Sequence, residues 1–467
     1  MSGPTRRVFL GAAAAGLAVG PRRARALRGR GRRPNIVFIN LDQAHWGTLG
    51  VHGERWVKTP NIDRLAVAGT DFHLSFASDP ACSPSRAAWM TGRPGSENGV
   101  MLNGLRLREG LPDIGAWLRE RAGYESCHVG KWHILGRPVN RAFEVLHEGS
   151  LLGEHGDLAT ALSAVGWLRN RKPGQPFLLM VGLLNPHDTC HWLGMARDRE
   201  EVPDPGLARE EVTPLPENMR VPRVEPALVK RIKRGWGMRQ KWRGWQWRSF
   251  LWAYQRQVEM ADGVVGLLLD AIAEHPEADN TVVILSGDHG DQLGRQGLTG
   301  KSVLYEDAAR VPLVLSWPGQ WAEGAVDQRR LVSGLDLAPT LCELAGVPPM
   351  PGARGLSLVP LVDGRGGIWR SHLVLECSVE GRAVRTPDLK WITYRDDPVE
   401  QLFDLSRDPL ETHDLGQEPA FEATRAELRR LLDEHAARLE PAPVARLSFD
   451  EAMAARTAPA LRFDEEG

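Results

Sequence analysis

Four segments of the chain are almost continuously apolar and end in polar side chains. They are PNIVFINLDQ (34–43), ESCHVGKWH (125–133), PFLLMVGLLNPH (176–187) and TVVILSGDHGD (281–291). Apolar runs of this length, without alternation, are typical of strands that are buried on both faces of a sheet. We therefore predict that these four segments are central strands.

Segments with helical periodicity lie between these strands, at 61–69, 111–123, 155–171 and 254–275. Alternation of strands and helices predicts an α/β fold with a large, mainly parallel sheet flanked by helices. In such sheets, ligands bind at the carboxyl ends of the strands. The residues at these ends are Asp42, Gln43, Lys131, His133, Asn185, His187, Asp288 and His289. The pattern therefore predicts a functional site at this edge.

A change in composition near residue 345 indicates a second unit. The Pro- and Gly-rich segment GVPPMPGARGLSLVPLV begins at residue 346, and short strand-like runs and one helical run follow it. We predict a large α/β domain over 34–345 and a small α+β subdomain with an antiparallel sheet over 346–440. We expect residues 441–467 to form a loosely ordered tail.

The segment 195–250 stands out as an insert rich in basic residues and tryptophan. Between residues 230 and 248 it holds eight basic residues, interleaved with four tryptophans. This composition suits a platform for an anionic or sugar-like substrate, or a membrane-surface contact. It also suits a helix whose tryptophans pack on the main sheet while its arginines face water. The sequence leaves these alternatives open.

The first 33 residues have the features of an export signal. Arg6 and Arg7 precede an apolar run of about a dozen residues, and Ala24-Arg25-Ala26 offers a cleavage site. The twin arginine resembles a bacterial Tat signal, so we expect the Tat export machinery as a partner. The expected location is periplasmic or secreted, with no stable membrane span after processing.

Charge and cysteine content narrow the class of protein further. The remaining 434 residues carry 49 basic and 59 acidic groups, a balance of −10, which gives no drive to bind nucleic acid. Five cysteines are present, and none forms a CxxC pair. Because five is an odd number, at least one thiol is free. Cys82 stands in the segment CSPSR, where it is either a small apolar residue or a reactive centre.

The segment CSPSR resembles the C/S-x-P-x-R signature of the type I sulfatases, in the alkaline phosphatase-like superfamily. NIVFINLDQ, GKWH, NPH, SGDHGD and GKSVLYEDAARVPLVLSWPG occur in that family's order, and EQLFDLSRDPLETHDLG is similar to the family's C-terminal subdomain. The resemblance covers about residues 35–440. It implies hydrolysis of a sulfate ester, either of a sulfated sugar or of an aryl alcohol.

The resemblance implies that a separate maturation enzyme oxidises Cys82 to Cα-formylglycine, whose hydrate is the nucleophile. One hydroxyl of the hydrate attacks sulfur, and the second lets the covalent sulfate hemiacetal collapse to the aldehyde. A serine would leave a sulfate ester without this internal exit. We predict a helix after Cys82, with Pro84 in its first turn and its N-terminal end facing the sulfate.

The resemblance also implies one divalent metal ion, bound by Asp42, Gln43, Asp288 and His289 together with residue 82. Carboxylate and amide oxygens suit a hard cation, so we expect Ca²⁺, with Mg²⁺ as an alternative. Many family members carry Asp in place of Gln43 and Asn in place of His289. The lost charge and the nitrogen donor keep Mn²⁺ and Zn²⁺ open as well.

Three cationic residues, Arg86, Lys131 and Lys301, are implied to hold the sulfate group and to stabilise the charge that develops on it. His133 is expected to orient or deprotonate the formylglycine hydrate. His187 and Lys301 are expected to protonate the leaving alcohol. The sequence does not decide which group is the acid and which the base.

Three other functions remain open. Gln43 and His289 also resemble the branch of phosphonate monoester and phosphodiester hydrolases, which would use the same site. A protein that binds sugar sulfates without turnover is a second alternative, although every expected type of site residue is present. A cysteine-dependent esterase is a third, but it would leave the metal-binding strand ends without a role.

Overall fold

The structure is a computed structural model of the chain, and it describes residues 32–198, 206, 213–220, 224–235 and 242–456. The expected export signal therefore lies almost entirely outside the described residues, as do parts of the insert. Within the described segments, none of the helices combines the length and the apolar character that crossing a membrane requires.

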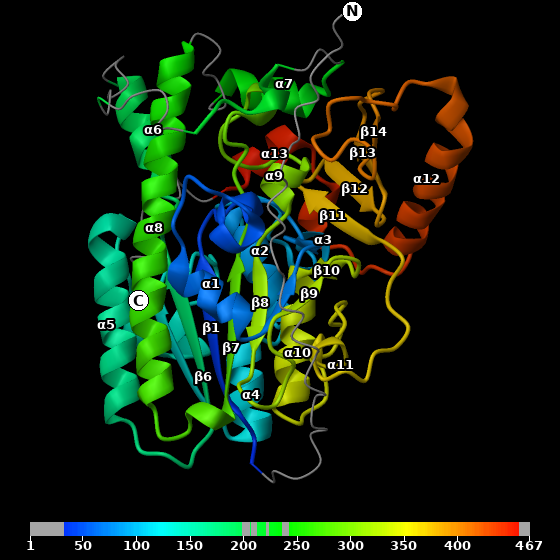
Figure 1. Ribbon diagram of the computed structural model, residues 1–467. Coiled ribbons are helices and arrows are strands. Elements are labelled where there is room, and N and C mark those ends of the chain that lie inside the picture. Colours follow the sequence, from blue (N-terminus) through cyan, green and yellow to red (C-terminus); the bar gives the residue numbers. More distant parts are fainter. Residues whose placement is uncertain (1–31, 199–205, 207–212, 221–223, 236–241, 457–467) are drawn as a thin grey trace, which may run out of the picture.

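An eight-stranded sheet forms the centre of the large domain (Figure 1). Its strands, in spatial order, are β5 (Glu144–His147), β4 (Glu125–Gly130), β6 (Phe177–Leu183), β1 (Asn35–Leu41), β7 (Thr281–Gly287), β8 (Leu313–Ser316), β2 (Thr70–Phe72) and β9 (Ala325–Asp327). The first five strands are parallel, and β8 is antiparallel to both its neighbours. The predicted mainly parallel sheet is confirmed, and β6, β1 and β7 end at the same edge.

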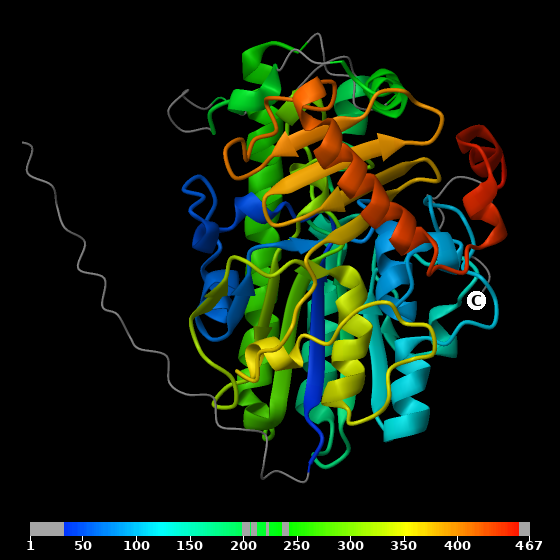
Figure 2. The ribbon, with the colours of Figure 1, turned by 90° about the vertical axis from the view of Figure 1, so that its right-hand side faces the viewer.

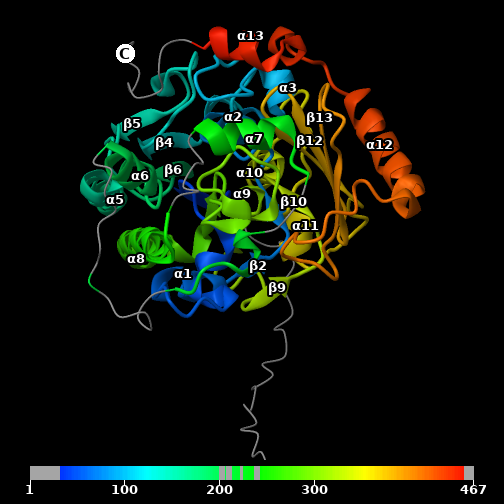
Figure 3. The same ribbon diagram turned by 90° about the horizontal axis from the view of Figure 1, so that it is seen from above.

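Helices cover both faces of this sheet (Figures 1 and 3). One face packs against α1 (Pro60–Val67), α5 (Gly153–Asn170) and α8 (Gly244–Glu274), and the other against α2 (Cys82–Thr91), α4 (Ile114–Ala122) and α10 (Leu337–Leu344). Side chains of β1 alternate between the two cores: Val37 and Ile39 face the first set of helices, whereas Ile36 and Phe38 face the second. This burial on both faces explains the unbroken apolar runs.

A four-stranded antiparallel sheet forms the small subdomain (Figure 2). Its strands are β11 (Leu373–Cys377), β12 (Gly381–Arg385), β13 (Leu389–Tyr394) and β14 (Gln401–Asp404). One face, with Ile392 and Phe403, packs against Tyr305 of the large domain. The other face, with Trp391, packs against Leu428 of α12 (Glu422–Ala436). The small antiparallel sheet predicted after residue 346 is confirmed.

Shorter elements complete the described chain. They are β3 (Ser75–Phe76), β10 (Val332–Ser333), α3 (Gly95–Asn98), α6 (Thr189–Asp198), α7 (Ala227–Gly235), α9 (Glu306–Ala309), α11 (Val359–Val362) and α13 (Phe449–Ala454). Strands β3 and β10 pair with each other in parallel.

The insert merges into the main domain. The helix expected over 254–275 begins ten residues earlier, at Gly244, within the predicted insert. Trp247 is buried and its ring packs edge-on against Trp242, at 5.2 Å between centroids, whereas Trp245 is 41% exposed. Trp236 lies outside the described residues. For Trp242 and Trp247, the structure supports packing on the main domain.

The expectation of a loose tail is wrong for residues 443–454. Helix α13 begins with a capping box, in which Ser448 Oγ accepts from the backbone N–H of Glu451 and the Glu451 carboxylate accepts from the N–H of Ser448. Ala452 is fully buried in a small apolar cluster with Met101 and Leu105. This local capping and packing order the segment.

Candidate active site

The carboxyl ends of three parallel strands of the large sheet build the floor of the site. Asp42 and Gln43 follow β1, Asp288 follows β7, and Lys131 follows β4. Strands β4 and β6 come very close at this edge. A Cβ on Gly130, which has a φ of 88°, would lie 2.2 Å from the carbonyl oxygen of Gly182. Only glycine fits there, and it allows the chain to turn Lys131 into the site.

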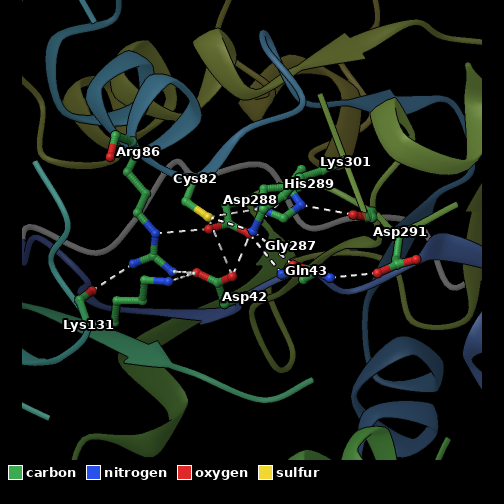
Figure 4. A network of polar contacts seen from close by, with 12 residues as sticks. Asp42, Gln43, Cys82, Arg86, Lys131, Gly287, Asp288, His289, Asp291 and Lys301 are labelled. Carbon is green, nitrogen blue, oxygen red and sulfur yellow. Dashed lines mark hydrogen bonds and ion pairs between the residues drawn. The ribbon is translucent and has the colours of Figure 1, made fainter. Parts of the chain in front are cut away.

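Cys82 is the first residue of α2 and is fully buried. The predicted helix is confirmed, with Pro84 in its first turn. The Sγ atom lies 3.1 Å from His289 Nε2 and 2.9 Å from Lys301 Nζ (Figure 4). The structure thus brings the cysteine of the CSPSR motif together with residues more than 200 positions away.

Two cations neutralise the carboxylates on the floor of the site. Arg86 bridges both carboxylates, with Nη2 at 2.9 Å from Asp42 Oδ2 and Nε at 2.9 Å from Asp288 Oδ2 (Figure 4). Lys131 Nζ lies 2.8 Å from Asp42 Oδ2. All four side chains are at most 7% exposed, so these charges depend on one another.

Charge and burial shift the pKa values in this cluster. Burial alone would raise the pKa of the Cys82 thiol, but Lys301, Lys131 and His289 bring it well below its usual value. Burial, followed by repulsion from Asp42, raises the pKa of Asp288 to about 6. Two neighbouring carboxylates repel each other when both are ionised, and a cation bound between them removes this repulsion. The pair is therefore a good binding site for a cation.

Four donor groups at this edge could hold one metal ion. Ligand atoms of Asp42, Cys82, Asp288 and His289 all lie within 4.8 Å of one another. His289 Nδ1 lies 2.8 Å from the carbonyl oxygen of Gly290, which fixes the proton on Nδ1 and leaves the Nε2 lone pair facing the site. The donor set and its negative charge fit a divalent ion.

Gln43 is held at both ends of its side-chain amide. Nε2 donates to Asp291 Oδ2 at 2.6 Å, and Oε1 accepts from Lys301 Nζ at 2.8 Å (Figure 4). The acceptor on one side and the donor on the other fix the orientation of the amide. Its oxygen therefore faces the side of the site where Lys301 approaches Cys82. Whether Gln43 is also a metal ligand remains a prediction.

His133 and His187 are half-buried and lie near the thiol. Burial, followed by the charge of Lys131, lowers the pKa of both rings, that of His187 to about 3. Interaction with Cys82 acts in the opposite direction on both. In each ring, Nδ1 is buried without a hydrogen-bond partner among the described residues. Both imidazoles are therefore neutral and able to accept a proton.

Two aspartates hold the loop that carries His187. Asp157 accepts hydrogen bonds from the backbone N–H groups of Leu184 and Asn185, at 2.7 and 2.8 Å. Asp188 accepts from the first N–H groups of α5, those of Gly153 and Glu154. This contact ties the end of β6 to the N-terminus of α5.

Sequence reasoning missed three supporting residues: Asp157, Tyr254 and Asp291. The hydroxyl of Tyr254 donates to the carbonyl oxygen of Gln43 at 2.7 Å and accepts from the N–H of His45. Asp291 stands in the SGDHGD segment, so its position offered a signal. No local signal pointed to Tyr254, since it lies within a long helix.

Comparisons with known proteins agree with this geometry. The model of the Sulfatase family matches residues 34–347, and the model described as N-sulphoglucosamine sulphohydrolase, C-terminal, matches residues 294–438. The first match covers the large domain with every site residue described above.

Similar proteins come from bacteria and from animals. A Delta 4,5-hexuronate-2-O-sulfatase of Bacteroides thetaiotaomicron is 29% identical over 87% of this chain and 89% of its own length. A choline-sulfatase of Rhizobium meliloti is 29% identical, over 87% of this chain and 86% of its own. A human N-acetylgalactosamine-6-sulfatase is 32% identical over 71% of this chain and 66% of its own.

Solved structures share the fold. That of a 2-O GAG sulfatase superposes with a TM-score of 0.76 and 26% identity, over 89% of this chain and 96% of the other. A phosphonate monoester hydrolase of Agrobacterium radiobacter superposes with a TM-score of 0.74 and 21% identity, over 87% and 96%, which shows a shared fold alone. The family models, the relatives and the arrangement around Cys82 agree, and the chain belongs to the sulfatase family.

Proposed function

We propose that this sulfatase hydrolyses the sulfate ester of a sulfated carbohydrate to an alcohol and inorganic sulfate, with converted Cys82 as the nucleophile. The observation that carries the proposal is the position of the Cys82 Sγ. It lies among the carboxylate and imidazole donors and is 2.9 Å from the ammonium group of Lys301. This is the arrangement that an attack on a sulfate anion requires.

Asp42, Asp288, His289 and residue 82 would hold the divalent ion, with Ca²⁺ as the expected metal. When bound, the ion acts as a Lewis acid that neutralises charge and lowers the pKa of a coordinated hydroxyl. Gln43 would serve as a further oxygen donor on the same side.

The positions of the three cationic side chains suggest which of them would face the sulfate group. Lys301 and Lys131 both lower the pKa of Cys82, so both place positive charge where the sulfate oxygens would lie. Arg86 donates hydrogen bonds to Asp42, Asp288 and the carbonyl oxygen of Lys131, so it orders the floor of the site. These contacts use three of the five N–H groups of its guanidinium, and direct contact of Arg86 with the sulfate stays a prediction.

The two neutral histidines divide the proton transfers. His133 and His187 have depressed pKa values and free Nδ1 atoms, so either can accept the proton of the attacking hydroxyl. In the unconverted chain, the charge of Cys82 raises the pKa of Lys301 despite burial. Asp42 and Asp288 act in the same direction and remain after conversion, so Lys301 would carry a proton at neutral pH. We assign the acid role toward the leaving alcohol to Lys301. His187 would share this role only after it has accepted a proton, since its ring is neutral.

The burial of Cys82 supports a conversion that precedes folding. The thiol is 0% exposed at the start of a helix that is buried along its whole length. A maturation enzyme could reach this side chain only before the large domain folds. Conversion in the cytoplasm followed by export of the folded protein through the Tat route fits this order, and we propose a periplasmic or secreted location.

Parallel rate measurements test the proposal. The full chain, produced together with a formylglycine-generating enzyme, is assayed on an aryl sulfate, an aryl phosphodiester and an aryl phosphonate monoester, then on sulfated monosaccharides. We expect sulfate esters to be hydrolysed fastest and the Cys82→Ala variant to be inactive on all substrates. A strong phosphodiesterase or phosphonate hydrolase rate beside a negligible sulfatase rate would favour the alternative hydrolase. Binding of sugar sulfates without turnover by converted protein would favour a non-catalytic role.

A further inference from the structure

A second cluster of metal-binding side chains lies beside strand β2. His52 ends the 3₁₀ helix Gly50–His52, Asp71 lies in β2, and His73 follows β2. His52 Nε2 lies 2.8 Å and His73 Nε2 3.3 Å from the same atom, Oδ2 of Asp71. None of these residues belongs to the donor set around Cys82, so the cluster has no role in the chemistry proposed above.

The cluster is shielded from water but has one open side. The side chains of His52 and Asp71 are 0% and 2% exposed, whereas that of His73 is 18% exposed. A buried carboxylate between two imidazoles is costly unless its charge is compensated. The exposure of His73 gives an ion a path into the cluster.

The hydrogen bonding of His52 defines its tautomer. Nδ1 lies 2.7 Å from the carbonyl oxygen of Trp46, so the proton of a neutral ring is on Nδ1. The lone pair of Nε2 then faces the Asp71 carboxylate at 2.8 Å, which is repulsive. A cation between the two groups, or a second proton on His52, removes this repulsion. An Nδ1–H bonded to a carbonyl group is also the arrangement that orients metal-ligating histidines.

Asp71 offers a further sign of a missing ligand. Its second oxygen, Oδ1, is buried and has no hydrogen-bond partner among the described residues. Buried carboxylate oxygens are rarely left without a partner, because such a group keeps its full desolvation penalty. Two hydrogen bonds from the histidines to Oδ2 alone would leave this oxygen unexplained.

We propose that His52, Asp71 and His73 bind a divalent transition metal ion of the Zn²⁺ class. Two imidazoles and one carboxylate are ligands that Zn²⁺ prefers and Ca²⁺ does not. Tetrahedral Zn²⁺ with bonds of this kind separates its ligand atoms by about 3.3 Å. The separations of 2.8 and 3.3 Å therefore need only a small adjustment. Water would take the fourth position, on the side of His73.

The ion would join the loop that follows β1 to strand β2. That loop begins with Asp42 and Gln43 of the active site and continues to His52. Trp46 stacks on the His52 ring, at 4.2 Å between centroids. The guanidinium of Arg310 lies 3.4 Å from the Trp46 centroid, and its charge opposes a further cation. The Asp71 carboxylate offsets this charge. Because the proposed ion would tie His52 of the loop to Asp71 and His73 at β2, its role would be structural.

Metal titration of the full chain tests this proposal. Chelator-treated protein carrying Asp288→Asn, which weakens the active-site ion, is titrated with Zn²⁺ or Co²⁺. Bound metal per chain and the visible absorption of Co²⁺ are then measured. We expect one tightly bound ion per chain, and an affinity loss of about 100-fold or more when His73→Gln is added. His413→Gln, at an exposed histidine of the small subdomain, should change nothing.

A second measurement does not need the His73 variant to fold. X-ray absorption at the Zn edge counts imidazole ligands of the ion in the Asp288→Asn protein. We expect two, whereas the donor set around Cys82 contains one histidine, His289. An ion with fewer than two imidazole ligands, no tightly bound ion, or an unchanged affinity after His73→Gln would overturn the proposal. The cluster would then be an ion pair of protonated His52 with Asp71.

Discussion

The side-chain amide of Gln43 donates a hydrogen bond of 2.6 Å to Asp291, and this contact points the Gln43 oxygen toward Lys301. The other oxygen of Asp291 accepts from the backbone N–H groups of Leu293 and Gly300. Asp291 therefore connects the loop after β7 to the residue after β1. It positions the Gln43 side chain in the active site.

Asp291→Asn should impair catalysis through Gln43. The oxygen of the new side chain would keep its hydrogen bonds from the backbone N–H groups of Leu293 and Gly300. Its NH₂ group would then point at the NH₂ group of Gln43, so the Gln43 amide would have to flip. The NH₂ group of Gln43 would then face Lys301. We expect kcat/KM on an aryl sulfate to fall by about 10- to 100-fold, mainly through kcat. Asp270→Asn, at an exposed ion pair, is the matched control and should leave the rate unchanged.

Arg86→Lys should lower the stability of the fold as well as the activity. A lysine cannot contact both Asp42 and Asp288 and also the carbonyl oxygen of Lys131, so a buried carboxylate loses its partner. We expect the free energy of unfolding to fall by about 3 kcal/mol in urea denaturation. Arg64→Lys, in the exposed pair with Asp270, should cost less than about 1 kcal/mol. Equal losses in both variants would contradict this role for Arg86.

Calcium should stabilise the protein through its carboxylates. Asp42 and Asp288 repel each other when no cation is bound, and this repulsion helps to raise the pKa of Asp288. At a Ca²⁺ concentration of 100 times Kd, binding should add about 2.7 kcal/mol to the free energy of unfolding. Thermal melts after chelation and after Ca²⁺ addition would measure this gain. The gain should be smaller for Asp288→Asn, and an equal gain would place the ion elsewhere.

Acid should destabilise the protein in part through His128. Burial, followed by the charge of Arg86, lowers the pKa of His128 to about 3, whereas an exposed histidine has a value of 6.5. The unfolded chain therefore takes up this proton first as the pH falls. The stability that neutral His128 provides is complete above pH 6.5 and is lost progressively toward pH 3.

Unfolding experiments at several pH values test this effect. His128→Gln should reduce the slope of stability against pH below pH 6.5 by up to about 1.4 kcal/mol per pH unit. His413→Gln, at an exposed histidine, should leave the slope as it is. If His128→Gln unfolds in acid as steeply as the unmodified chain, His128 is not the group that takes up the proton.

The sequence was sufficient to predict the site residues that directly follow a predicted strand. Asp42, Asp288 and Lys131 could be placed together because parallel strands of a sheet end at the same edge, and β4, β6, β1 and β7 do so in register. Cys82 could be placed with them through the resemblance of its motif. Local pattern and family signature were sufficient for these residues.

The supporting contacts depend on loop geometry and could not be predicted. The role of Tyr254 arises because α8 packs across β1 and brings a hydroxyl 211 residues away in sequence to Gln43. The bridging role of Arg86 follows from three simultaneous contacts in the folded chain. A capping box and burial of Ala452, rather than a strong hydrophobic pattern, order the segment before the C-terminus.

The mass of the tryptic peptide 65–86 tests the central claim most directly. The peptide is taken from a preparation that hydrolyses an aryl sulfate, and it contains Cys82 without an internal cleavage site. We predict a peptide lighter by the change from thiol to aldehyde, and reactive with a hydrazide. An active preparation whose peptide carries only the unmodified thiol would contradict the claim that converted Cys82 is the nucleophile.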